Sequence, residues 1–182
     1  MASNHLTGIG SESKQLATWY FTFAAIIFGA QLLFGLVAAI QFVMPGFLYG
    51  IVDFSIARII HINALVVWMV FAMFGSVYWL LPDETGIETI GIKVGKLLFW
   101  VFAAAIVVVV LVYLFIQVGP ADETTIWFIT EGREYIEAPR WADFGIVVVA
   151  LGFVANLFLT GIKGNRSGIV TVLMADMIAF AG

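Results

Sequence analysis

The chain has 182 residues and a formal net charge of −4, and 63% of its residues are hydrophobic against 11% that are charged. Its mean hydropathy is +1.08, whereas a soluble globular domain is only about 45–50% apolar, so the composition predicts an integral membrane protein. Cysteine is absent from the sequence, which excludes disulfides and thiolate-ligated metal centres within the chain. It carries neither a glycine-rich nucleotide-binding motif nor a basic stripe, so the sequence does not favour binding of nucleic acid.

Four apolar stretches are long enough to cross a bilayer, whose hydrocarbon core takes about 20 helical residues. We place these spans near residues 16–44, 54–81, 96–118 and 144–162. Proline and glycine are expected to end the helices at Pro45-Gly46, Pro82, Pro120 and Gly161 to Gly164. The predicted fold class is therefore all-α, a polytopic transmembrane helical bundle that forms a single membrane domain over residues 1–182.

The second span contains two ionisable residues, in the motif Arg58-Ile59-Ile60-His61-Ile62-Asn63. An ionisable side chain at membrane depth costs roughly 2.5–3.5 kcal/mol and by default indicates a functional site. Positions i and i+3 share a helix face, neutral imidazole is a common ligand of haem iron, and arginine binds carboxylates such as haem propionates. The motif favours a b-type haem. The alternatives are a histidine that bonds a neighbouring carbonyl and an arginine that anchors the helix at the interface.

Lysine and arginine are unevenly divided between the predicted loops. If the N-terminus is cytoplasmic, that side carries Lys14, Lys93, Lys96, Lys163 and Arg166, and the opposite loops carry Arg133 and Arg140. The positive-inside rule therefore predicts a multi-pass protein with a cytoplasmic N-terminus. His61 then lies roughly 10 Å below the outer surface, where a haem would be within reach of an external electron donor.

A fifth apolar stretch, residues 169–182, would extend only about 21 Å as a helix, against a hydrocarbon core of about 30 Å. A chain end inside lipid leaves backbone carbonyls unpaired. We therefore interpret this stretch as a truncated fifth span and the chain as the N-terminal part of a longer polypeptide. Asp176 interrupts the apolar pattern, and we expect it to make a local hydrogen bond rather than to relay protons.

Two separated blocks carry a family resemblance. The first is the segment from Phe54 to Asn63, followed by Val66-Val67-Trp68 and by Tyr78-Trp79-Leu80-Leu81-Pro82-Asp83-Glu84. The second is Glu131-Gly132-Arg133-Glu134-Tyr135-Ile136-Glu137-Ala138-Pro139, which leads into the segment from Gly145 to Phe153. Together they resemble the large subunit of bacterial cytochrome c-dependent nitric oxide reductases, in the haem-copper oxidase superfamily, and the resemblance covers nearly the whole chain.

The resemblance implies roles for a few residues. His61 matches one axial ligand of the low-spin haem b, whose other ligand comes from a later helix, and Arg58 and Arg133 match arginines near the haem propionates. Glu134 matches a ligand of a calcium ion, which is a hard cation that prefers oxygen. Glu137 matches a carboxylate suspected in proton entry from the outer side.

The family's activity gives the expected function. Two nitric oxide molecules, two electrons and two protons yield nitrous oxide and water at a high-spin haem b paired with a non-haem iron, whose ligands would lie beyond Gly182. The resemblance implies an enzyme of the respiratory electron transport chain in denitrification, located in the bacterial inner membrane, with a membrane-anchored cytochrome c subunit as partner.

Two alternatives remain open from the sequence. One is the large subunit of a C-family haem-copper terminal oxidase, which reduces oxygen to water. The other is a non-enzymatic membrane scaffold or transporter fragment that carries a buried histidine.

Overall fold

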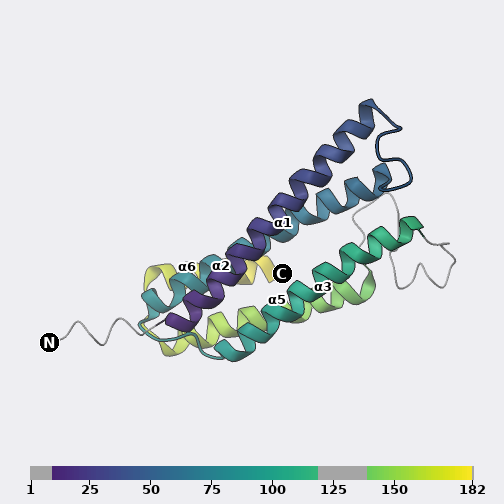
Figure 1. Ribbon diagram of the computed structural model, residues 1–182. Coiled ribbons are helices and arrows are strands. Elements are labelled where there is room, and N and C mark those ends of the chain that lie inside the picture. The colour runs from purple at the N-terminus through teal and green to yellow at the C-terminus, as the bar shows by residue number, and fades with distance from the viewer. Residues whose placement is uncertain (1–9, 119–138, 182) are drawn as a thin grey trace. The chain divides into compact units, whose positions relative to one another are not determined.

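The computed structural model describes residues 10–118 and 139–181. Over these residues the chain forms helices without strands, as Figure 1 shows. The helices are α1 (Ser11–Val43), α2 (Phe54–Thr85), α3 (Ile92–Val118), α5 (Arg140–Lys163) and α6 (Gly168–Ala181). Four of them, α1, α2, α3 and α5, are long and apolar enough to cross a membrane. The predicted fold class, an all-α polytopic membrane bundle, is therefore confirmed.

The four long helices cover the predicted spans except for residue 44, which follows the end of α1, and they begin several residues earlier in α1, α3 and α5. Helix α1 begins at Ser11, directly after Gly10, whose φ of 81° is in the left-handed region. Glu12 in the first turn places a negative charge at the positive end of the helix dipole. Helix α6 has 14 residues, and its interpretation as a truncated fifth span stays a prediction.

The expected end of the second helix at Pro82 is wrong, because α2 continues to Thr85. Proline lacks the N–H that an interior helical residue donates, but the residues that follow it restore hydrogen bonds in this last turn. The Thr85 hydroxyl donates to the Leu81 carbonyl at 2.6 Å, and the Gly86 N–H donates to the Pro82 carbonyl at 2.9 Å. By contrast, α1 ends at Val43, just before Pro45-Gly46, as expected.

The chain divides into two compact units, to which α1, α2, α3 and α5 each contribute residues. Unit 1 takes its described residues from Met1–Thr22, Phe71–Val101 and Val147–Gly182. Unit 2 takes its described residues from Phe23–Val70 and Phe102–Ile146.

Unit 1 has an aromatic core. The rings of Phe74 and Phe153 stack with centroids 3.8 Å apart, and Tyr20 lies edge-on to Phe99 at 4.9 Å. Its buried polar groups are bonded to one another: Asn156 donates to the Tyr78 hydroxyl at 3.0 Å, and Thr160 accepts the Ile90 N–H at 2.9 Å. These bonds tie α2, α5 and the segment before α3 together.

Unit 2 has an aliphatic core in which residues of α2, α3 and α5 meet. Its buried members are Ile56, Ile59, Ile60, Val109, Tyr113 and Ala142. The connection from α1 to α2 is held by the Gln41 side-chain amide, which donates to the carbonyls of Phe47 at 3.0 Å and Val52 at 2.6 Å. This unit contains His61 and Arg58.

Candidate functional site

His61 lies on α2 in unit 2, half-buried against α1. Its Nδ1 atom is 2.8 Å from the main-chain oxygen of Gln31. A carbonyl oxygen only accepts hydrogen bonds, so this contact requires the proton on Nδ1. The neutral ring then has its lone pair on Nε2, which is the tautomer in which histidine binds a metal through Nε2. The contact to Gln31 is therefore compatible with ligation, and it also matches the simpler interpretation of a histidine bonded to a carbonyl.

Gly35 makes this approach of the imidazole to α1 possible. It lies one turn after Gln31, on the same face of the helix. A Cβ atom at this position would be 2.6 Å from Nδ1 and 2.7 Å from Cε1 of His61. Any residue other than glycine at position 35 would therefore require the His61 ring to move.

Arg58, one turn before His61 on α2, is also half-buried. Its guanidinium carbon lies 5.9 Å from the centroid of the Phe54 ring, within the range of a cation–π contact. Its i, i+3 spacing from His61 places both residues on one helix face. This placement agrees with the predicted propionate role and leaves that role a prediction.

Three buried side-chain atoms have no hydrogen-bond partner in the part of the chain that the structure describes, and all of them belong to unit 2. They are Oε1 of Gln31, Oε1 of Gln41 and Nε1 of Trp68. Roughly 90% or more of buried polar groups in native proteins are bonded. All three residues lie on the two helices that meet at His61: Gln31 and Gln41 on α1, and Trp68 on α2. These three atoms leave hydrogen-bonding capacity in the helices on either side of His61 that no described residue uses.

An open hollow of about 500 Å³ lies in unit 2 where α1 passes into α2. Its lining residues are Gln41, Phe42, Pro45, Tyr49, Asp53, Phe54 and Ser55. His61 is not among them, so this hollow is separate from the predicted ligand.

Several predicted site residues lie outside the described residues. These are Arg133, Glu134 and Glu137, so their assignments stay predictions. In residues 10–118 and 139–181, no group of three or more His, Cys, Asp or Glu side chains is arranged to hold a metal ion. Asp176 is exposed on α6, and no hydrogen bond to it is found within these ranges, so the local bond expected for it is not seen.

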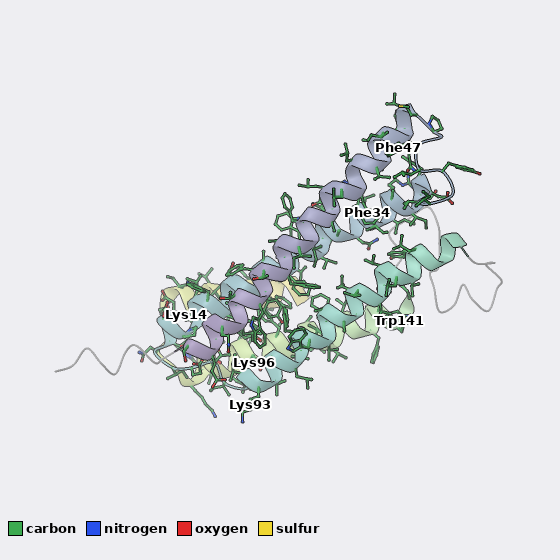
Figure 2. The ribbon with its side chains drawn as sticks, viewed as in Figure 1. Lys14, Phe34, Phe47, Lys93, Lys96 and Trp141 are labelled. Carbon is green, nitrogen blue, oxygen red and sulfur yellow. The ribbon has the colours of Figure 1, made fainter. Side chains whose placement is uncertain are left out.

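Of the basic residues used to predict orientation, the five assigned to the side of the N-terminus belong to unit 1. They are Lys14, Lys93, Lys96, Lys163 and Arg166. Figure 2 shows three of them, Lys14, Lys93 and Lys96, in the same part of this unit. Lys14 pairs with Asp83 at 2.7 Å and Lys96 with Glu12 at 3.0 Å.

Comparison with known proteins extends over nearly the whole chain. Residues 15–181 match the family described as cytochrome c and quinol oxidase polypeptide I. The chain belongs to this family. It is also similar to a nitric oxide reductase subunit of Stutzerimonas stutzeri, with 42% identity over 172 residues. That alignment covers 93% of this chain and 36% of the relative, so the chain spans about a third of the relative's length. The predicted resemblance is confirmed, and the chain is a multi-pass membrane member of the family.

Sequence reasoning missed Gln31 and Gly35. A glutamine and a glycine four residues apart in an otherwise apolar span are a signal for a helix–helix contact, since small residues permit close approach and polar residues bond across helices. The sequence does not say which helix they face. The structure supplies that partner, His61 of α2.

Proposed function

We propose that the chain forms part of the large subunit of a nitric oxide reductase and that His61 supplies one axial ligand of its low-spin haem b. In the intact enzyme, two nitric oxide molecules, two electrons and two protons give nitrous oxide and water. The bound haem would carry single electrons to the catalytic metals, which other parts of the protein would hold. The chain's own contribution is to form one membrane domain and to position the ligand.

One observation carries the ligand assignment: Nδ1 of His61 bonds the Gln31 carbonyl at 2.8 Å. This bond fixes the tautomer and the orientation of the ring and increases the basicity of the other nitrogen. Membership of the oxidase family and 42% identity to a nitric oxide reductase subunit support the same assignment. The identity favours nitric oxide over oxygen as the substrate.

The direct test is His61→Ala in the complete subunit within its complex. The absorption and paramagnetic resonance signals of the low-spin haem should disappear, while the protein remains inserted in the membrane. The high-spin haem signal serves as an internal control, because the proposal assigns His61 to the low-spin haem alone. A low-spin signal that survives unchanged would remove His61 as the ligand.

We further propose that the N-terminus and the loops that carry Lys14, Lys93, Lys96, Lys163 and Arg166 are cytoplasmic, because these five residues follow the positive-inside rule. A reporter fused after Gly164 should be cytoplasmic, and a cysteine introduced at Phe47, in the connection from α1 to α2, should react with an impermeant label from outside. The reverse pattern would invert the topology. With this orientation, electrons enter from an outer cytochrome c subunit.

Arg58 and Arg133 are proposed to bind the haem propionates, and Glu134 is proposed to bind a calcium ion beside them. Glu137 is proposed to take part in proton entry from the outer side. Calcium would offset the combined negative charge of the propionates and these carboxylates. Glu134→Gln should therefore lower the calcium content of the purified complex and perturb its haem spectra, with insertion unchanged. Unchanged calcium content would contradict this proposal.

A further inference from the structure

Gly35 and the main-chain carbonyl of Gln31 form a pair on α1 that acts on His61 from the opposite helix. We infer that this pair is a positioning device for the haem ligand: the carbonyl orients the imidazole, and the missing side chain at residue 35 gives the ring room to reach it. The inference rests on the proposed ligand role of His61 and extends it to α1. Neither Gly35 nor Gln31 touches the reacting atoms, so both are positioning residues.

The main-chain carbonyl of Gln31 can accept two hydrogen bonds. It lies four residues before Gly35 in a continuous helix, where it accepts the Gly35 N–H. A carbonyl oxygen has a second lone pair, and the Nδ1–H of His61 uses it at 2.8 Å. A main-chain acceptor inside a helix does not swing between rotamers as a side-chain acceptor does. It therefore holds the imidazole at a fixed distance from α1.

The contribution of Gly35 is steric. A Cβ at position 35 would lie 2.6 Å from Nδ1, 2.7 Å from Cε1 and 3.4 Å from Cγ of His61, so it would press on the ring itself. These atoms belong to a side chain, not to a backbone. In Gly35→Ala the helices can therefore keep their places while the ring turns away and loses the Gln31 bond.

Another glycine of α1 provides a matched control. A Cβ at Gly29 meets no described atom within 4 Å. Gly29→Ala and Gly35→Ala bring the same gain in helix propensity, of about 1 kcal/mol at most. Any difference between the two variants therefore reports the contact at position 35.

The experiment compares Gly35→Ala with Gly29→Ala in the full-length subunit, purified within its complex. Loss of a bond that orients a metal ligand typically weakens metal retention about 10–100-fold. Gly35→Ala should therefore retain low-spin haem b about 10–100-fold more weakly. The haem that remains should show an altered low-spin resonance. Its midpoint potential should be higher, because the histidine ligand is less basic. Gly29→Ala should match the wild type. If both variants match the wild type while His61→Ala loses the haem, the inference is wrong and the proposed function stands.

A double variant separates positioning from general packing. In the His61→Ala background no imidazole remains for a Cβ at position 35 to displace. Gly35→Ala should then change the thermal unfolding midpoint no more than Gly29→Ala does, although it should lower the midpoint when His61 is present. An equal loss of stability in both backgrounds would show that Gly35 serves packing alone, and would overturn the inference. If His61→Ala keeps the low-spin haem, the proposed function and this inference both fail.

Discussion

The two units of the chain differ in how their buried polar groups are hydrogen-bonded. In unit 1 such groups bond one another, as with Asn156 and Tyr78 at 3.0 Å and with Ser13 and Thr89 at 2.7 Å. In unit 2, Gln31, Gln41 and Trp68 each bury a side-chain atom that has no partner in the described part of the chain. An unpaired buried polar group costs about 1–3 kcal/mol, so within the described residues unit 1 satisfies its buried polar groups more fully than unit 2 does.

The proposed haem ligand belongs to unit 2. Unit 1 has the stacked rings and closed hydrogen bonds of a structural core. Unit 2 holds His61 and Arg58 on one helix, and the Nδ1 bond leaves Nε2 of His61 for a further ligand. Substitutions in the core of unit 1 should therefore lower stability, and substitutions around His61 in unit 2 should lower haem binding.

The largest effect on stability is expected from Phe153→Ala in unit 1. Phe153 is 2% exposed and stacks on Phe74 at a centroid distance of 3.8 Å. Truncation of a buried phenylalanine leaves a cavity and costs about 3–5 kcal/mol. The free energy of unfolding of the complex should fall by this amount, and Phe153→Leu should cost less. Molecules that remain folded should keep their low-spin haem spectrum. Loss of that spectrum before unfolding would contradict the claim that unit 1 contributes stability and not haem binding.

A smaller effect is expected from Asn156→Leu, which keeps the size of the side chain and removes its bond to the Tyr78 hydroxyl. The unpaired hydroxyl should cost about 1–3 kcal/mol of unfolding free energy. In the double variant with Tyr78→Phe neither partner is left unpaired, so the loss should be smaller than the sum of the two single losses. Additive losses in unfolding measurements would mean that this bond does not stabilise unit 1.

The smallest effect is expected from Trp68→Phe in unit 2. Its ring lies edge-on to Phe28 at 5.2 Å, a contact that phenylalanine can keep. If a group outside the described residues accepts the Nε1–H in the intact complex, the substitution should cost about 1 kcal/mol of unfolding free energy. Trp100→Phe is the control, because Trp100 is 60% exposed. Equal stability of the two variants would mean that Trp68 has no partner in the complex, and would weaken the contrast between the units.

The membrane helices could be predicted from the sequence because apolar length alone identifies them. Their ends were less predictable. Pro82 signals a stop, yet α2 continues to Thr85, because the Thr85 hydroxyl and the Gly86 N–H supply bonds to the carbonyls of that turn. Bonds of this kind depend on side-chain rotamers and on the following loop, which a hydropathy pattern does not contain.

The candidate site was predicted on one helix only. His61 and Arg58 are recognisable because ionisable residues are costly in a membrane. Gln31 and Gly35 are 30 and 26 residues before His61 in the sequence, and they matter only because α1 packs against α2 at that level. The identity of a helix neighbour is a tertiary property, so no local pattern assigns a polar or small residue to its partner.

The most direct test of the central claim is an experimental structure of the intact complex with its cofactors bound. We predict that Nε2 of His61 ligates a haem iron directly, while Nδ1 stays within hydrogen-bond distance of the Gln31 carbonyl. A low-spin haem ligated by other residues, with His61 bonded only to α1, would contradict the account.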